Sequence, residues 1–236
     1  YSIVVKEKNR NVINEAFRVV RTNLEFMQGK NGHSPIIMVT SMNPGSGKTF
    51  ITMNLATSLA IKGKKVLAID LDLRKASLST YIQSPEKGVT NYLIGQANTY
   101  NEVIVKGKTH PNLDILPVGT IPPNPTELLF ENHLEQMLSE LKNQYDYIFI
   151  DCPPVEIVAD TSIINKYADQ TLFVIRAELL ERTMLPEIEK FYQTDKYKNM
   201  VLLLNGTTDA YTYGYHKYGY RYGYHYGYGK GYSKED

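Results

Sequence analysis

The stretch IIMVTSMNPGSGKTF, residues 36–50, indicates the fold class of this chain more strongly than any other segment. It starts as a short apolar run, passes through small residues and continues in a helix-forming pattern. Gly45 and Gly47 let the backbone curl with its N–H groups pointing inward, and Lys48 and Thr49 come next. A buried strand, a glycine turn and a helix N-terminus in this order form a phosphate-binding loop.

Each polar group of this loop has an expected role. Lys48 is long enough to reach the outer phosphates of a nucleotide, and the Thr49 hydroxyl can bind Mg²⁺. The pattern G-x-x-x-x-G-K-[ST] has glycine where this chain has Met42, so the prediction depends on PGSGKT, residues 44–49, and on its context. A glycine-rich turn that only starts a helix is the alternative, but it leaves the lysine unexplained. The expected nucleotide-binding residues of the loop are Gly45, Ser46, Gly47, Lys48, Thr49 and Phe50.

Patterns typical of buried strands and of helices alternate along the chain. Short, nearly continuous apolar runs cover residues 36–40, 65–70, 113–119, 147–151, 171–175 and 200–205. Helical patterns cover 48–62, 126–143, 160–168 and 181–192, and another starts at Val12. The alternation predicts an α/β fold with a P-loop NTPase-like, mostly parallel sheet flanked by helices. We expect three parts: an N-terminal helical segment (1–30), a nucleotide-binding domain (31–206) and a flexible tail (207–236).

Composition excludes several classes of protein. The formal net charge is +1, which gives no reason to expect a nucleic-acid partner. Cys152 is the single cysteine, so no disulfide can form within the chain, and a reducing compartment is expected. No apolar run approaches ~18 residues, so no membrane span is expected within this sequence. The first residue is Tyr1 and not methionine, so we expect a fragment or a processed chain.

Three aspartates stand at the ends of predicted buried strands. Asp70 and Asp72 close VLAIDLD, where alternation puts both on one side and Leu71 on the other, and Asp151 closes YIFID. The carboxyl edge of a parallel sheet is where α/β proteins bind ligands, so these acids are expected near Mg²⁺ and phosphate. A helix cap or a loop hydrogen bond is the alternative for any single one of them. Arg74 follows and could equally pair with phosphate or with an aspartate.

The segment YTYGYHKYGYRYGYHYGYGKGYSKED, residues 211–236, contains ten tyrosines and six glycines among its 26 residues. It has nothing to pack its phenols against, and no fold is predicted for it. On composition alone it could be an adhesive segment, or a disordered segment without function.

With the phosphate loop, VLAIDLDLRK (66–75) and YIFIDCPP (147–154) in view, the chain resembles the bacterial tyrosine kinases (BY-kinases) from about residue 9 to its end. GTIPPNPTELL (119–129) is similar to the Pro-rich stretch of that family, and the tyrosine-rich tail is a second point of resemblance. EAFRVVR (15–21) matches the E-x-x-R-x-x-R helix of the family. The resemblance implies a P-loop protein-tyrosine kinase that uses ATP and Mg²⁺ and phosphorylates its own tail.

The resemblance also implies roles for single residues. Asp70 would be the base that accepts the phenolic proton, and Asp72 would be a metal partner. The expected metal ligands are Thr49, Asp72 and Asp151, and the expected catalytic set is Lys48, Asp70, Asp72 and Asp151. Asn205, at the end of the last strand, is a candidate contact to adenine. Cys152 stands where threonine is commoner in the family, and a buried inert thiol is favoured over a redox switch.

Partners are implied in the same way. Glu15, Arg18 and Arg21 would assemble copies of the chain into a ring, with the tail of one subunit in the site of the next; alone, they could be a solvated charged face. The expected phosphoacceptors are Tyr211, Tyr213, Tyr215, Tyr218, Tyr220, Tyr222, Tyr224, Tyr226, Tyr228 and Tyr232. Such kinases regulate polymerisation and export of capsular polysaccharide or exopolysaccharide at the cytoplasmic face of the bacterial membrane. They act with a membrane activator, in the same or another chain, and with a tyrosine phosphatase.

Two other functions fit the same fold. A partitioning or division ATPase of the MinD/ParA type has an extra lysine early in the loop, where this chain has Asn43, and has no tyrosine tail. A non-catalytic scaffold could use the loop only to sense nucleotide. Incubation with labelled ATP and Mg²⁺ separates the three functions, because only a kinase leaves label on tyrosine and only an ATPase releases phosphate alone.

Overall fold

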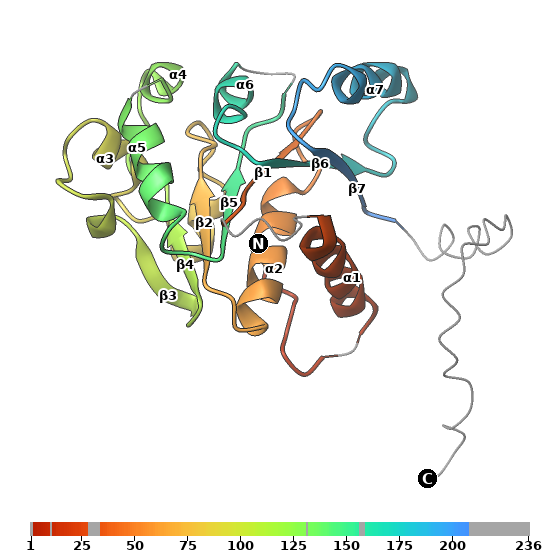
Figure 1. Cartoon of the computed structure of the whole chain (residues 1–236), viewed down its shortest axis with the longest axis horizontal. Helices are drawn as coiled ribbons and strands as arrows, with labels where there is room; N and C mark the ends of the chain where they lie inside the picture. Colours follow the sequence, from red (N-terminus) through yellow and green to blue (C-terminus); the bar gives the residue numbers. More distant parts are fainter. Residues whose placement is uncertain (1, 10, 28–33, 131, 156–158, 208–236) are drawn as a thin grey trace, which may run out of the picture. The chain divides into compact units, whose positions relative to one another are not determined.

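The computed structural model describes residues 2–9, 11–27, 34–130, 132–155 and 159–207 (Figure 1). Residues Tyr1–Asn205 form one compact unit. The remainder, Gly206–Asp236, forms a second unit, of which only residues 206 and 207 are described. The ten tyrosines expected to accept phosphate therefore lie outside the described residues.

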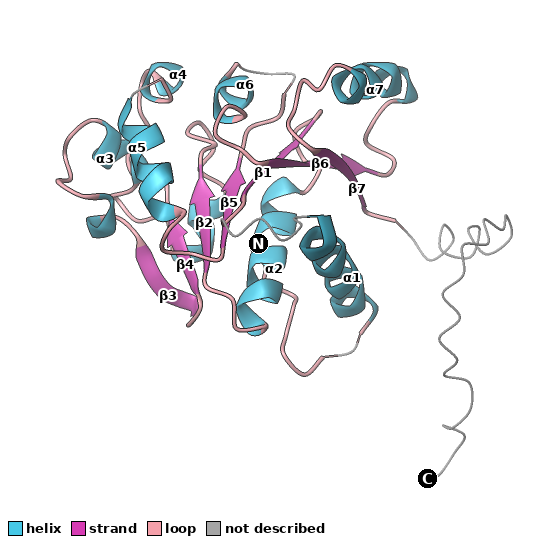
Figure 2. Ribbon diagram, in the orientation of Figure 1, coloured by secondary structure: helices cyan, strands magenta, loops and turns pink. Residues whose placement is uncertain are grey.

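A single sheet forms the middle layer of the compact unit (Figure 2). In the described part of the chain its strands are β1 (Ile36–Ser41), β2 (Val66–Asp70), β3 (Val105–His110), β4 (Leu113–Leu116), β5 (Tyr147–Asp151), β6 (Gln170–Arg176) and β7 (Met200–Asn205). Their order is β3-β4-β2-β5-β1-β6-β7, and all neighbours run parallel except β3 against β4. The predicted mostly parallel α/β fold is confirmed. Because β1 lies between β5 and β6, its following loop leaves the sheet at a topological switch point, where such folds bind ligands.

Helices cover both faces of the sheet. The helices α1 (Val12–Met27) and α2 (Lys48–Ile61) lie on one face, and α3 (Val89–Leu93), α5 (Asn132–Leu141), α6 (Asp160–Ile164) and α7 (Leu185–Gln193) lie on the other, with α4 (Pro125–Leu128) beside α5. Alternate residues of β1 divide between the two cores: Ile37 and Val39 pack toward α2, whereas Ile36 and Met38 pack toward the other helices. The sheet is therefore apolar on both faces, as its continuous apolar runs predict.

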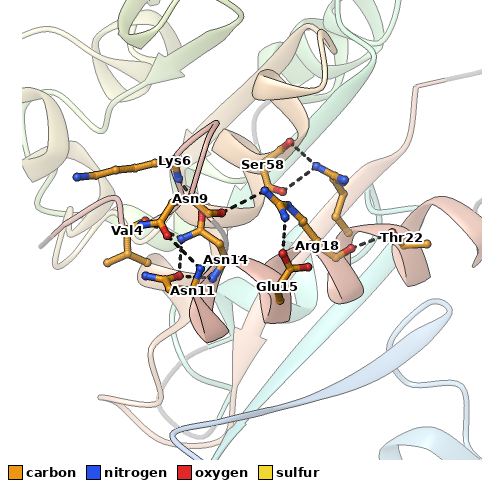
Figure 3. Close-up of polar contacts among 10 residues, drawn as sticks. Val4, Lys6, Asn9, Asn11, Asn14, Glu15, Arg18, Thr22 and Ser58 are labelled. Carbon is orange, nitrogen blue, oxygen red and sulfur yellow. Dashed lines mark hydrogen bonds and ion pairs between the residues drawn. The ribbon is translucent and has the colours of Figure 1, made fainter. Parts of the chain in front are cut away.

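The helix α2 is buried on nearly all sides. Eleven of its 14 residues are buried, because the sheet covers one side and α1 the other. Two asparagines tie the N-terminal segment to this pair. Asn54 Oδ1 accepts from Val4 N at 2.8 Å. Asn14 Oδ1 accepts from Lys6 N at 2.8 Å (Figure 3). The backbone N–H groups of Val4 and Lys6, which pair with no strand in the described structure, therefore bond to side chains.

Several local predictions need correction. The strand β3 is not predicted, because its sequence VKGKTH is polar and none of its residues is buried at the antiparallel edge. The helix expected over 126–143 is two helices, α4 and α5, and no proline or glycine between them marks the break. The helix expected over 160–168 ends at Ile164, and the one expected over 181–192 starts with a 3₁₀ turn, Arg182–Met184, before α7.

Candidate active site

The loop between β1 and α2 has the backbone of a phosphate cradle. Gly45 and Gly47 adopt left-handed conformations, with φ of 79° and 96°. A Cβ added at Gly47 would lie 2.3 Å from the Asn205 side-chain nitrogen, so a larger residue here would displace Asn205 and strain the backbone. Met42 is not among the residues with positive φ, and its side chain is buried in the core. The position where the pattern has glycine therefore does not need one in this chain.

Side chains at the ends of β6 and β7 bind the backbone of the loop. Arg176, at the end of β6, donates to Gly45 O at 2.8 Å, and Asn205, at the end of β7, donates to Ser46 O at 2.9 Å. The Ser46 hydroxyl donates to Asn43 O at 2.8 Å. Because these donors engage loop carbonyls, the loop N–H groups are left for an anion. Asn205, expected to contact adenine, thus contacts the loop backbone.

The start of α2 adds to this anion site. Gly47 is the N-cap residue and offers no side chain to cap the helix. The N–H groups of the first turn and the positive end of the helix dipole therefore face outward at Lys48 and Thr49.

A cavity of about 250 Å³ opens in front of the loop. It brings Lys48 and Thr49 together with Asp72, from the segment after β2. Its lining is Pro44, Gly45, Gly47, Lys48, Thr49, Phe50, Asp72, Lys75, Ser77 and Pro154. A larger cavity of about 820 Å³ lies at the opposite end of β6 and β7, beside Gln170 and Met200, and contains none of the predicted site residues.

Lys48 is a buried cation. Its residue is 8% exposed, and its ammonium makes no hydrogen bond within the described ranges. Burial lowers the pKa of the Lys48 ammonium, whereas the charges of Asp151 and Asp72 raise it. A desolvated lysine between two carboxylates does little for folding, but it can meet phosphate oxygens at low reorganisation cost.

Two of the acids are neighbours in the sheet. The parallel register of β2 and β5 pairs Asp70 with Asp151. Asp151 Oδ2 accepts from the Thr49 hydroxyl at 2.6 Å, and its Oδ1 is buried without a partner. Burial raises the pKa of Asp151 well above its ordinary value, and the charge of Asp70 adds to this effect, whereas the Thr49 hydrogen bond opposes it.

Asp70 lies behind the cavity and not in its lining. It is fully buried, and its Oδ2 accepts from both the backbone N and the hydroxyl of Ser79, each at 2.8 Å. Burial raises the pKa of Asp70 to about 7, although the Ser79 hydrogen bonds oppose the shift. The Ser79 hydroxyl also accepts from Val118 N at 2.9 Å, so it links Asp70 to the root of the Pro-rich stretch.

The residues present fit a magnesium nucleotide. Hydroxyl and carboxylate oxygens are the protein ligands that Mg²⁺ takes, and Thr49 and Asp151 already touch. The unpartnered buried Asp151 Oδ1 is a second oxygen suited to a cation or its water. Across the described residues no group of three or more His, Cys, Asp or Glu side chains is arranged to hold a metal. The predicted set of Thr49, Asp72 and Asp151 contains only two acids, so phosphate and water would supply the other ligands.

The structure shows the partner of Arg74 and the environment of Cys152, both of which the sequence leaves open. Arg74 pairs with an aspartate: its Nε lies 3.4 Å from Asp160 Oδ2, and its Nη2 donates to the Thr126 hydroxyl at 3.2 Å. Cys152 is fully buried, and burial raises the pKa of its thiol well above the ordinary value, which favours an inert cysteine.

Similarity to known proteins agrees with this site. Residues 34–200 match the family described as AAA domain. The tyrosine-protein kinase CpsD of Streptococcus agalactiae is 35% identical over 209 residues, covering 87% of this chain and 89% of that protein. The tyrosine-protein kinase YwqD of Bacillus subtilis is 32% identical and covers 91% of each. The chain belongs to the bacterial tyrosine-protein kinases.

Solved structures support the same placement of this kinase. The kinase domain of Escherichia coli tyrosine kinase ETK superposes with a TM-score of 0.73 at 31% identity, covering 90% of this chain and 80% of that one. The septum site-determining protein MinD of Pyrococcus horikoshii, solved with Mg-ADP, has a TM-score of 0.60 at 25% identity, over 72% of the kinase and 70% of MinD. A putative tyrosine-protein kinase in the cps region of Klebsiella pneumoniae is 33% identical, and the match covers 28% of it.

Sequence reasoning missed several groups that the fold brings to the site of this kinase. Arg176 lies 131 positions from Gly45, and Ser79 lies nine positions after Asp70; no sequence pattern marks either of them. Lys75 lines the cavity beside Asp72, whereas the expectation from sequence concerns its neighbour Arg74. The sequence pattern that could have identified Lys75 is its position three residues after Asp72.

Proposed function

We propose that this kinase transfers the γ-phosphoryl group of Mg-ATP to tyrosines in the C-terminal tail of a neighbouring copy. One observation carries the proposal: Lys48, Thr49 and Asp72 line a single cavity, and Asp151 is hydrogen-bonded to Thr49. The cavity therefore joins a cationic wall for phosphate oxygens to an anionic wall for a metal. Phosphoryl transfer needs this combination more than it needs covalent help from the protein.

The geometry supports the following binding roles. The backbone from Gly45 to Phe50 and the Lys48 ammonium would hold phosphate oxygens. Thr49, Asp72 and Asp151 would hold Mg²⁺ directly or through water. The metal, when bound, neutralises phosphate charge and aligns the phosphates. Asn205 would act on the nucleotide through the loop that it supports.

The transfer itself requires a proton acceptor. A bond forms between the tyrosine Oη and the γ-phosphorus, the bond from that phosphorus to the bridging oxygen breaks, and ADP leaves. The phenolic proton passes to a carboxylate. We assign this role to Asp70, because a pKa of about 7 suits a base at neutral pH and its Oδ1 is buried without a partner. Asp70 is fully buried and does not line the cavity of the nucleotide-free chain, so this role requires its Oδ1 to become accessible to the phenol when the substrates bind. Asp72 is assigned to the metal because it lines the cavity beside Thr49.

The tail is the proposed substrate. Glycine between the phenols keeps the segment pliable, so that many tyrosines reach one site in turn. Each added phosphate contributes about −1.5 to −2 charge near pH 7. Several on clustered tails would repel one another and loosen a ring of subunits. Native mass measurement before and after ATP tests this step, and an unchanged assembly would contradict it.

The helix α1 is the proposed assembly surface. Arg18 forms an ion pair with Glu15 and donates to Asn9 O at 3.1 Å (Figure 3). Arg21 donates to Ser58 O of α2 at 3.0 Å, so it is anchored within its own subunit. The surface left for a neighbour is Glu15 and Arg18 together with the exposed apolar side chains of the helix. These side chains are Val12, Ile13, Val19, Phe26 and Met27. Exposed apolar groups in such number on one helix are typical of an interaction surface.

The wider role is proposed from the relatives. One of them is named for a cps region, which supports regulation of capsular polysaccharide or exopolysaccharide polymerisation and export. We propose a membrane activator and a tyrosine phosphatase as partners, and the cytoplasmic face of the membrane as location. Within the described residues, no helix combines the length and apolar character needed to cross a bilayer.

Two chains mixed in one tube test transfer between copies. The donor carries phenylalanine at all ten tail tyrosines, and the acceptor carries Lys48→Met with the natural tail. Incubation with labelled ATP and Mg²⁺ is expected to label the acceptor tail, and peptide mass mapping identifies the tyrosines. Phosphate release without tyrosine label would support an ATPase of the MinD type, and neither product would support a nucleotide-sensing scaffold.

A further inference from the structure

Two basic residues follow Asp72, and the fold commits only one of them to the protein itself. Arg74 Nε lies 3.4 Å from Asp160 Oδ2, and Thr126 donates to Asp160 Oδ1 at 2.6 Å. Asp160 is fully buried, so its charge needs this pairing. Arg74 is therefore held toward the Pro-rich stretch and α6, and it is not in the lining of the phosphate cavity.

Lys75 takes the other direction. Its backbone N donates to Asp72 O at 3.2 Å and to Asp72 Oδ1 at 3.1 Å, and Ala76 N donates to Asp72 O at 2.8 Å. This tight turn, which ends with Ala76 at φ 49°, places Lys75 in the wall of the cavity that also holds Lys48 and Thr49. The same carboxylate proposed for the metal thus fixes the backbone of Lys75.

The ammonium of Lys75 has no carboxylate of its own. Among the described residues it forms no ion pair and no side-chain hydrogen bond. Its charge also lies near enough to Lys48 to lower the pKa of that ammonium, as the smallest of several causes. Lys75 is exposed, so water screens its repulsion with Lys48, and an anion bound in the cavity would attract both cations.

The two cations come from different segments of the chain. Lys48 belongs to the loop, which cradles the whole phosphate chain, whereas Lys75 comes from the segment after β2 with Asp72. That side is where an incoming phenol must approach if Asp70 and Asp72 act as proposed. We infer that Lys75 is a second phosphate-binding cation, which contacts the oxygens of the γ-phosphoryl group and not the rest of the nucleotide. This inference rests on the proposed nucleotide site.

Equilibrium binding to the full chain tests the inference without any turnover. The two probes are Mg-ADP and the Mg complex of a non-hydrolysable ATP analogue with an imido bridge, and the variant is Lys75→Met. We expect affinity for the analogue to fall about tenfold, as for the loss of a charge-assisted hydrogen bond, and affinity for Mg-ADP to change less than about twofold. Lys75→Arg should restore most of the analogue binding, and Lys106→Met, an exposed lysine on β3, should change neither.

The remaining outcomes contradict the inference. Equal losses for both probes would mean that Lys75 acts on the nucleotide as a distant charge, and no loss for either would mean that it has no contact. If the unmodified chain fails to bind Mg-ADP, or binds it equally well after Lys48→Met, the nucleotide site itself is wrong and Lys75 loses its role with it. If Mg-ADP binds normally and Lys75→Met changes the affinities for the two probes equally, only the inference about Lys75 is overturned, and the nucleotide site stands.

Discussion

Replacement of Asp70 by asparagine should stabilise the nucleotide-free kinase at alkaline pH. Asp70 is fully buried, and its pKa is raised from 3.8 to about 7. Between these two values the folded chain keeps a proton that the unfolded chain has lost, so the free energy of unfolding falls as pH rises. Asparagine can still accept from Ser79 through its oxygen, and its nitrogen replaces an oxygen that has no partner.

The size of this effect follows from the pKa difference. A shift of about three pKa units, at 1.36 kcal/mol each, lowers the free energy of unfolding by about 4 kcal/mol once pH exceeds the folded pKa. Only part of this loss occurs between pH 6 and pH 8, because at pH 6 most of the penalty is already present. Linkage for a single group with these two pKa values gives a loss of about 1.4 kcal/mol over that interval.

Urea unfolding followed by far-ultraviolet circular dichroism measures this difference. The unmodified chain should lose about 1.4 kcal/mol more than Asp70→Asn between pH 6 and pH 8, and Asp70→Asn should be the more stable of the two at pH 8. Asp195→Asn is the control, because Asp195 is exposed and its left-handed backbone also suits asparagine. Equal pH dependence of the two chains, or a native chain that gains stability toward pH 8, would refute the reasoning.

Three further substitutions test the supports of the site. Gly47→Ala should weaken Mg-ADP binding at least tenfold, because φ is 96° and the Asn205 amide lies 2.3 Å from the new Cβ. Adding Asn205→Ala to this variant should restore only part of the binding, since the backbone strain at residue 47 remains. Titration calorimetry measures both affinities. Thr49→Ala should weaken the Mg²⁺ dependence of nucleotide binding, because it removes one of the three side chains proposed to hold the metal and leaves Asp72 and Asp151; an unchanged Mg²⁺ dependence would contradict that role. Ser79→Ala should lower the free energy of unfolding by about 1–3 kcal/mol in urea, because a buried backbone N–H at Val118 loses its acceptor, and a cost near zero would show that this link is dispensable.

The parts of the site that sequence predicts are those that depend on short stretches of chain. The loop at 44–49 contains its own turn, its glycines and its lysine, and the structure gives Gly45 and Gly47 the left-handed backbone that such a loop needs. The acids at 70 and 151 are predictable because parallel strands end at one edge, and the register indeed pairs them.

Local patterns fail where contacts or solvent exposure override them. The polar edge strand β3 carries no apolar run, so its pairing with β4 is visible only in three dimensions. Three contacts at the site join residues that are distant in sequence. Arg74 and Asp160 lie 86 positions apart, Arg176 and Gly45 lie 131 apart, and Asn205 and Ser46 lie 159 apart.

Sequence alone is enough to predict a mostly parallel sheet with a phosphate loop after its first strand, because strand burial and loop conformation are local properties of residue type and spacing. Tertiary structure was needed to show that Asp70 lies behind the cavity while Asp72 and Lys75 line it, and that Arg74 is turned away. The reason is that burial, register and long-range hydrogen bonds, which no short segment contains, determine where each charged group comes to rest.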